Sequence, residues 1–383
     1  GAVYQGGLRL LQRGQLADAG VALACAQAGL ESAAYLTRKS ASWRVLQGTG
    51  AWVAGQDIGK GSVSVAAADP ADGSVEVVLG TTSSAADTVR LLSAGSYQGL
   101  TRKLRADYLP PPHESVTYVI GSLSTVGLQN VNVTGRIRAN STISDYGGVT
   151  LNGNLTTVEG SSVSPSLIDF DTDTLFVADS LSLPDINFAY LRSIAEPLTV
   201  PWDRTFSNHV LSRERNHWGA VSPAGIYSID GGGGEIYMYN CYLEACLIVY
   251  NTSVFNIHGP WSSDAVWFYH ASPDTSRLPA LVVDGDVDMR VERLSMEVYH
   301  PTLGLVQVRS ALHGVFLCTG EFWGPQTYAD APIELVGTII AAEAHIRGPG
   351  TVIRHDPQLN RSALVELTEP KGLRLVPGTV REL

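Results

Sequence analysis

Apolar positions recur at a constant interval of six residues near the middle of the chain, at Val131, Ile137, Ile143, Val149 and Leu155. Small residues follow four positions after each of the first four, at Gly135, Ser141, Gly147 and Gly153. Short apolar strands separated by tight corners predict a β-solenoid, in which each strand gains burial only by stacking on the next. Five repeats make fewer than two coils of a three-sided solenoid. We therefore expect three chains to share the column as a trimer.

A second series of apolar segments runs from about residue 226 to the end of the chain. Two or three segments fall within each stretch of roughly 20–25 residues, which is typical of the coils of a parallel β-helix. No helical pattern separates them, which argues against a doubly wound α/β fold. A β-sandwich stays open, although only Asp230-Gly231 and Asp284-Gly285 supply its typical hairpin dipeptides. The predicted strand cores are 226–229, 236–239, 247–250, 254–257, 266–269, 281–283, 287–291, 294–298, 305–308, 315–317, 333–336, Ile346, 352–353, 364–367 and 373–376.

The first sixty residues have a different pattern, with a heptad seam of large and small residues. It consists of Leu16, Leu23 and Leu30, each followed three positions later by Ala19, Ala26 or Ala33. The seam runs for under three heptads and contains glycines, so it is too short to predict a coiled coil by itself. Two interpretations stay open: a helical hairpin packed on its own domain, or a short oligomeric helical collar.

A small β segment and a stiff joint follow. Residues 61–65 and 73–77 alternate apolar and polar positions around an Ala-Asp-Pro-Ala-Asp turn, which predicts a β-hairpin. Pro110–Pro112 marks a domain boundary.

The expected fold is therefore mostly β, a right-handed parallel β-helix preceded by a small α+β part and the six-residue repeat. We expect four segments: a helical collar or cap at 1–60, a β/α connector at 61–112, the repeat segment at 113–165 and the β-helix at 166–383.

The composition of the chain excludes or disfavours several classes of protein function. The chain of 383 residues is 44% hydrophobic and carries a net charge of −11, which excludes general disorder and disfavours a nucleic-acid partner. No apolar run approaches the roughly 20 residues that a membrane span requires. The four cysteines fit neither a disulfide framework nor a zinc signature, and we expect no metal and no cofactor. Motifs of serine nucleophiles and of metallohydrolases are also absent from the sequence.

The strongest acidic constellation is the segment 284–292. Strand alternation places Asp284, Asp286, Asp288, Arg290 and Glu292 on one face. Carboxylates two residues apart on a strand lie roughly 6.6–7 Å from each other, close to the spacing that inverting glycosidases use. Asp286 and Glu292 are therefore candidate catalytic residues, and a solvated acidic face neutralised by Arg290 is the alternative.

A second candidate site follows four consecutive glycines. Glu235, Tyr237 and Tyr239 share one face of a predicted strand, and a carboxylate beside tyrosines suits a sugar. Glu235 is a further candidate catalytic residue, and structural stacking of the tyrosines is the alternative.

Aromatic residues gather in the same half of the chain. Trp261, Trp267 and Trp323 are candidate glycan contacts, because a strand such as 266–270 cannot bury every ring. A trimer interface and a plain core are the alternatives for these rings.

In the order of its segments, the chain resembles bacteriophage tailspike and tail-fibre subunits. The helical and small-β front, the joint at Pro110–Pro112, the repeat at 131–155 and the long β-helix after residue 226 follow in that order. The resemblance implies a homotrimer on the virion or outside the cell. It would attach to other tail proteins through its N-terminal part and bind a bacterial surface polysaccharide. Cleavage of that polysaccharide stays open, as do a secreted polysaccharide-degrading enzyme and a purely structural virion protein.

Overall fold

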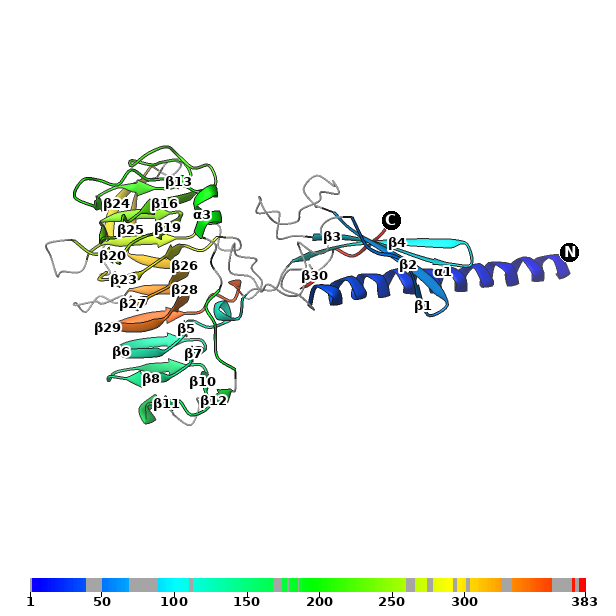
Figure 1. Ribbon diagram of the computed structural model, residues 1–383, viewed down its shortest axis with the longest axis horizontal. Coiled ribbons are helices and arrows are strands. Elements are labelled where there is room, and N and C mark those ends of the chain that lie inside the picture. Colours follow the sequence, from blue (N-terminus) through cyan, green and yellow to red (C-terminus); the bar gives the residue numbers. More distant parts are fainter. Residues whose placement is uncertain are drawn as a thin grey trace. The chain divides into compact units, whose positions relative to one another are not determined.

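The computed structural model consists of two compact units, Gly1–Pro111 with Thr368–Leu383, and Pro112–Leu367 (Figure 1). The structure describes residues 2–38, 50–68, 89–109, 113–167, 174–177, 179–184, 186, 188–259, 266–273, 278–291, 295–300, 304–324, 333–359, 374–375 and 379–383. The predicted strands at 73–77 and 364–367, and the joint at 110–112, lie outside these residues.

The first unit is one long helix on an antiparallel sheet. Helix α1 (Ala2–Arg38) packs against β1 (Gly50–Ile58), β2 (Gly61–Ala68), β3 (Val89–Tyr97) and β4 (Leu100–Leu109), which pair in sequence order. Two short strands at the end of the chain, β30 (Arg374–Leu375) and β31 (Arg381–Glu382), both pair with β4. The second unit is therefore inserted into the first, and the expected β-helix segment 166–383 loses its last residues to this sheet.

The heptad seam packs on its own domain, as one of the two interpretations expected, but not as a hairpin. The helix is single and continuous rather than a hairpin, and Ala26, Leu30 and Ala33 pack on the sheet. Gly95 of β3 permits this contact, because a Cβ there would overlap the backbone of Ala22. Leu16, nearer the start of the helix, is 72% exposed.

The second unit is a three-walled parallel β-solenoid, in agreement with the predicted β-helix-like fold (Figure 1). The first wall contains β13 (Glu196–Pro197), β16 (Ile226–Asp230), β19 (Cys246–Tyr250), β22 (Leu281–Val283), the ends of β26 (Ala311–Cys318) and β28 (Glu334–Ala341), β5 (Ile120–Ser122), β7 (Ile137–Ala139), β10 (Leu155–Val158) and β12 (Thr174–Val177).

The other two walls follow the same coils. The second contains β14 (Thr205–Ser207), β17 (Ile236–Tyr239), β20 (Val254–Ile257), β23 (Asp286–Met289), β27 (Glu321–Trp323), the starts of β29 (Glu343–Arg354) and β6 (Thr125–Thr134), β8 (Thr142–Asp145) and β11 (Ser162–Val163). The third contains β15 (Val210–Leu211), β18 (Cys241–Glu244), β21 (Phe268–Ala271), the starts of β26 and β28, the ends of β29 and β6, and β9 (Thr150–Asn152). The hairpin β24 (Ser295–His300) and β25 (Gly304–Arg309) is antiparallel and pairs outside the column.

The coils do not stack in sequence order. The chain enters in the middle of the column at β5, winds to one end at β12, and continues at the other end with α3 (Phe188–Ile194) and β13. It then winds back until β28 pairs with β5 and β29 pairs with β6.

This order of the coils shows that burial of the apolar strands does not require the expected trimer. Leu155 pairs with Ile137, so three six-residue repeats form one coil, as their period predicts. The repeat segment is not a separate domain, because the last coils of the same chain cover it; Ile120 pairs with Ile339. The apolar faces are thus buried without a second copy.

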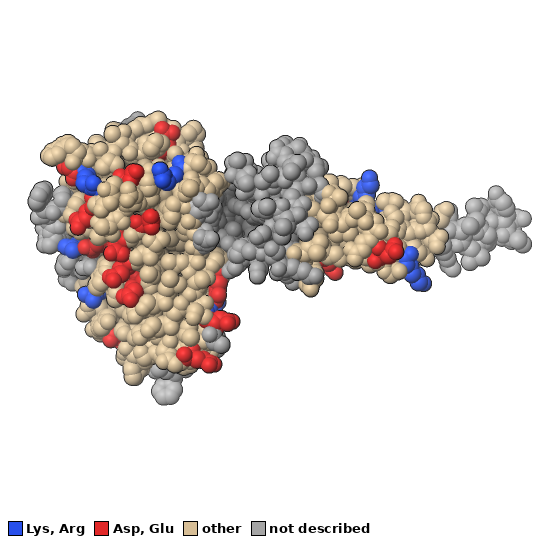
Figure 2. Space-filling view, viewed as in Figure 1, with Lys and Arg blue, Asp and Glu red and all other residues tan. Residues whose placement is uncertain are grey.

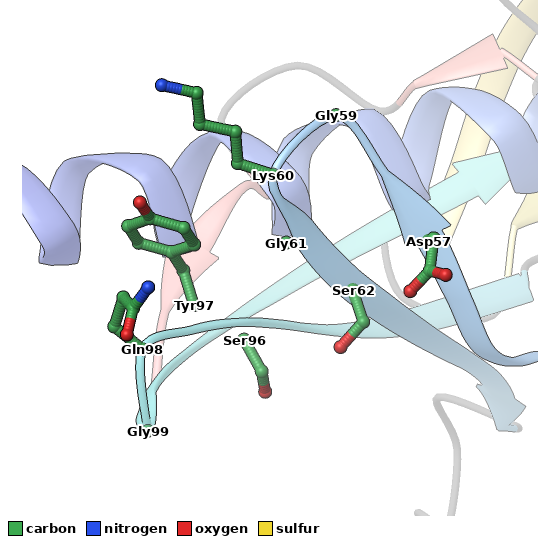
Figure 3. A pocket seen from close by; sticks show the side chains of 9 residues that line it. All are labelled: Asp57, Gly59, Lys60, Gly61, Ser62, Ser96, Tyr97, Gln98 and Gly99. Carbon is green, nitrogen blue, oxygen red and sulfur yellow. The ribbon is translucent and has the colours of Figure 1, made fainter.

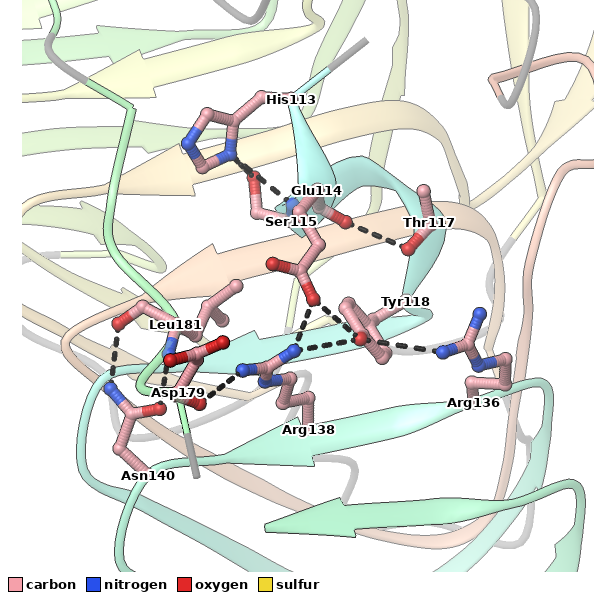
Figure 4. Close-up of polar contacts among 10 residues, drawn as sticks. All are labelled: His113, Glu114, Ser115, Thr117, Tyr118, Arg136, Arg138, Asn140, Asp179 and Leu181. Carbon is pink, nitrogen blue, oxygen red and sulfur yellow. Dashed lines mark hydrogen bonds and ion pairs between the residues drawn. The ribbon is translucent and has the colours of Figure 1, made fainter. Parts of the chain in front are cut away.

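A strap of residues 179–184, 186 and 188–194 crosses the first wall and is held by buried polar contacts (Figure 4). Arg138 of β7, with a side chain 5% exposed, pairs with Glu114 and donates to the Tyr118 hydroxyl and the Asp179 carbonyl. Asn140 accepts from the Leu181 amide and donates to the Leu181 carbonyl, both at 2.7 Å. The hydrogen bonds of Arg138 and Asn140 therefore hold the strap against the first wall.

Candidate functional site

Outward side chains of the second wall form rows along the column, because its strands are parallel and in register. One row contains Tyr237, Asn256, Asp288, Trp323 and His345, each paired with the next. We call it the mixed row. The acidic row lies beside it and consists of Glu235, Asp286, Glu321 and Glu343, each two residues before a member of the mixed row. Figure 2 shows acidic side chains gathered over these coils.

A groove of about 410 Å³ lies between the two rows. It is lined by Glu235, Val254, Asn256, Asp286, Val287, Asp288, Arg290 and Trp323. Val287 itself points into the column and is fully buried, so the floor of the groove is rigid. The groove therefore presents one large ring, one amide, one guanidinium and three carboxyl groups on fixed strands.

Trp323 is held at one side of the groove with its orientation fixed. Its indole N–H donates to Glu321 at 2.7 Å, and its ring stacks on His345 with centroids 4.1 Å apart. The guanidinium of Arg347 lies 5.0 Å from the Trp323 ring centroid. A half-buried, pre-oriented aromatic ring is a suitable platform for an apolar sugar face.

Asp288 lies at the centre of a charged triplet. Its Oδ2 accepts from Arg290 at 2.8 Å and lies 3.4 Å from His258 Nε2. Burial by itself would raise the pKa of Asp288, but hydrogen bonds from His258 and Arg290 outweigh it and hold the pKa below its ordinary value. Asp288 is therefore a carboxylate at neutral pH, suited to accept hydrogen bonds and not to donate a proton.

Asn256 provides an unused donor in the groove. The residue is 5% exposed, and its Nδ2 has no hydrogen-bond partner. Asp288 Oδ1 is likewise buried without a partner. Buried polar atoms are nearly always paired, so two unpaired atoms in one groove indicate the position of a ligand's polar groups.

Four of the predicted site residues come together here. Glu235, Asp286 and Trp323 line the groove, and Tyr237 donates its hydroxyl to Glu235. That hydrogen bond raises the pKa of the Tyr237 hydroxyl. Tyr239 lies on the same outward side of β17, two residues further along.

Trp267, another predicted site residue, does not reach the groove. Trp267 is 3% exposed, packs against Val210 and Tyr242, and donates its indole N–H to Val308 at 3.1 Å. The expectation of a glycan contact at Trp267 is therefore not met, because the third wall and β25 bury the ring. Trp261 and Glu292 lie outside the described residues.

Sequence reasoning missed Asn256, His345 and Arg347, and it counted Asp288 and Arg290 only as part of an acidic strand. Their signal is a shared outward position in successive coils. That signal was concealed because loops of unequal length separate the strands, so no constant spacing marks the row.

A separate hollow of about 540 Å³ lies in the first unit, between the turns that join β1 to β2 and β3 to β4 (Figure 3). Glycines and the exposed ends of Lys60, Tyr97 and Gln98 line it. None of its described lining residues has a buried polar atom without a hydrogen-bond partner, so the hollow does not indicate a ligand site.

The part of the chain that the structure describes has neither a metal site nor a membrane-spanning helix. No three histidine, cysteine or acidic side chains gather closely enough to hold a metal ion. No described helix is long and apolar enough to cross a membrane.

No protein-family model and no curated protein matches the chain. Among solved structures, it is similar to the competence-associated pilin ComZ from Thermus thermophilus, with 10% identity over 96% of this chain and 97% of that one, at a TM-score of 0.27. It is also similar to the DUF3494 domain of Shewanella frigidimarina ice-binding protein 1. There the identity is 10% over 65% of this chain and 98% of that one, at a TM-score of 0.23. At these TM-scores, neither likeness supports a function for this chain.

Proposed function

We propose that the chain is a polysaccharide-binding subunit of a surface fibre, of the bacteriophage tailspike or tail-fibre type, in which the solenoid recognises a bacterial glycan. The groove of the second wall carries this proposal. It places a pre-oriented ring, Trp323, beside the unpaired donor of Asn256 and the unpaired acceptor of Asp288. A ring for the sugar face and polar groups for its hydroxyls are the elements of a carbohydrate site.

Binding without cleavage fits these carboxyl groups better than hydrolysis. A glycosidase needs a protonated carboxyl of raised pKa, whereas the pKa of Asp288 is lowered. Asp286 Oδ1 already accepts the backbone N–H of Glu321 at 2.8 Å, so the neighbouring strand holds this carboxyl in place.

The test is binding of the full chain to a panel of oligosaccharides from bacterial surface polysaccharides. We expect saturable binding without release of reducing ends, weakened at least tenfold by Trp323→Ala. Phe176→Ala is the matched control, because this ring is 48% exposed on β12, which belongs to the first wall. Absence of binding to every glycan, or equal losses in both variants, would contradict the proposal.

The helix–sheet unit is the expected attachment and assembly part. Its role is supported by topology, since both ends of the solenoid connect to it and β30 and β31 close its sheet. We propose a homotrimer, to be tested by light scattering of the full chain. A molar mass near three chains supports it, and a monomer contradicts it.

A subunit of a bacterial surface filament is the second candidate, favoured by helix α1. The helix begins well before its sheet (Figure 1), and Leu16 in its first half is 72% exposed. Apolar side chains on such a segment gain burial by packing on other copies. Immunogold labelling separates the candidates, since it would mark virion tails in one case and cell-surface filaments in the other.

A further inference from the structure

The acidic row places carboxylates in adjacent coils. Asp286, Glu321 and Glu343 follow one another on β23, β27 and β29, and Glu321 pairs directly with Glu343. Parallel strands are about 4.8 Å apart, so these side chains repeat at that interval along the column. Like charges directly opposite each other on a sheet are destabilising, and the row is therefore costly for the fold itself.

Groups of the protein satisfy these carboxylates without neutralising them. Glu321 accepts the Trp323 indole N–H, and Asp286 accepts a backbone N–H. Glu235 accepts the Tyr237 hydroxyl. All three of these donors are uncharged.

The cations of the wall lie in another row. Arg290 is paired with Asp288, and Arg347 lies over the rings of Trp323 and Tyr146. At the two ends of the acidic row, His345 Nε2 lies 3.4 Å from Glu343, and Arg204 donates its Nε–H to the Glu235 carbonyl, whereas no described cation pairs with Asp286 or Glu321. The row therefore keeps a negative charge that a ligand can neutralise.

The unpaired atoms of the groove indicate the rest of that ligand. Asn256 Nδ2 is a buried donor that requires an oxygen acceptor, and Asp288 Oδ1 is a buried acceptor that requires an N–H or O–H. Trp323 offers a ring face beside them. A ligand that satisfies all of these groups carries hydroxyls, an apolar ring face and regularly spaced positive charges.

We infer that the groove binds a polysaccharide of amino sugars with free amines, laid along the column so that its ammonium groups meet carboxylates of the acidic row. These carboxylates lie at multiples of about 4.8 Å along the column, so a regular polymer can repeat the contact. This inference rests on the proposed function and specifies the class of glycan.

The test compares two probes on the full chain by calorimetry: a hexamer of β-1,4-linked glucosamine and the same hexamer fully N-acetylated. We expect the glucosamine hexamer to bind at least tenfold more tightly at low salt, with a preference that shrinks as salt is added. Glu321→Gln should weaken the glucosamine hexamer about tenfold and leave the acetylated one unchanged. Glu159→Gln, an exposed carboxylate on the turn after β10, is the matched control and should change neither.

The outcomes distinguish this inference from the proposed function. Equal binding of the two hexamers, or tighter binding of the acetylated one, would overturn the inference and leave a glycan site in place. Binding of another bacterial glycan that Trp323→Ala abolishes, with neither hexamer bound, would do the same. Failure of every glycan to bind would overturn both. Circular dichroism of Glu321→Gln confirms that a loss of binding is not a loss of folding.

Discussion

Trp323 and His345 stack one coil apart, with ring centroids separated by 4.1 Å and ring planes inclined by 21°. The stack depends on a glycine in the next coil. Gly127 pairs with His345, and a Cβ at this position would lie 3.0 Å from His345 Nδ1 and 2.9 Å from the Tyr146 ring. The orientation of the ring in the groove is thus set by three successive strands.

The first prediction concerns that glycine. Gly127→Ala should displace His345, tilt Trp323 and weaken glycan binding several-fold, while the free energy of unfolding falls by only about 1–2 kcal/mol. Titration of the same oligosaccharide against wild type and variant measures the effect. Unchanged affinity would show that the stack does not position the ring.

A second prediction concerns the corners of the column. Gly337 has φ +151°, and a Cβ there would overlap the Gly314 carbonyl oxygen in the preceding coil. Gly337→Ala should therefore lower the free energy of unfolding by about 3 kcal/mol or more.

Gly20 of α1 is the control for that substitution, because a Cβ there meets nothing within 4 Å. Gly20→Ala should raise the free energy of unfolding of the helix–sheet unit by about 1 kcal/mol, since glycine is a poor helix former. Urea unfolding of both variants checks the opposite signs, and equal effects would contradict the corner argument.

The third prediction concerns the strap over the first wall. Asn140→Ala removes both hydrogen bonds to Leu181, so the Leu181 amide should exchange with deuterium at least tenfold faster. Asn132→Ala, at an exposed position on β6, should leave that exchange rate unchanged. If both variants exchange alike, other contacts hold the strap.

The fourth prediction is a pH dependence of stability. His270 is fully buried, and burial lowers its pKa to about 4, although its ring Nε2–H donates a hydrogen bond to the Ala245 carbonyl. The unfolded chain has an ordinary histidine pKa of about 6.5, so it takes up the proton first as the pH falls. The free energy of unfolding should therefore decrease from pH 6.5 down to about pH 4, by about 3 kcal/mol for this group, and level off below.

His270→Phe provides the comparison for that slope. The introduced phenylalanine ring fits beside Phe268 and Phe316, because both of these rings contact the His270 ring edge to face. The variant should lose part of the pH dependence between pH 6.5 and 4 in urea unfolding measured at several pH values. An unchanged slope would assign the effect to other groups.

The local pattern of apolar and polar residues was sufficient to predict the short strands and their six-residue period. Val131 to Leu155 gave the length of one coil side, and most strand cores between 226 and 353 lie within or beside the observed strands, because burial on one side of a strand leaves a direct trace in the sequence. It also placed Glu235, Tyr237 and Asp286 on outward faces, and these side chains lie in or beside one groove with Trp323.

Tertiary structure decided what those strands stack against. Ile120 pairs with Ile339, more than two hundred positions away, and no short stretch of the sequence specifies such a partner. For the same reason, the alternation of apolar and polar residues around Trp267 could not show that β25 covers this ring. Nor could the sequence show that Asn256 and Trp323 line one groove. The amino-acid pattern determines which side of a strand is buried, whereas the pairing of distant strands determines which outward side chains become neighbours.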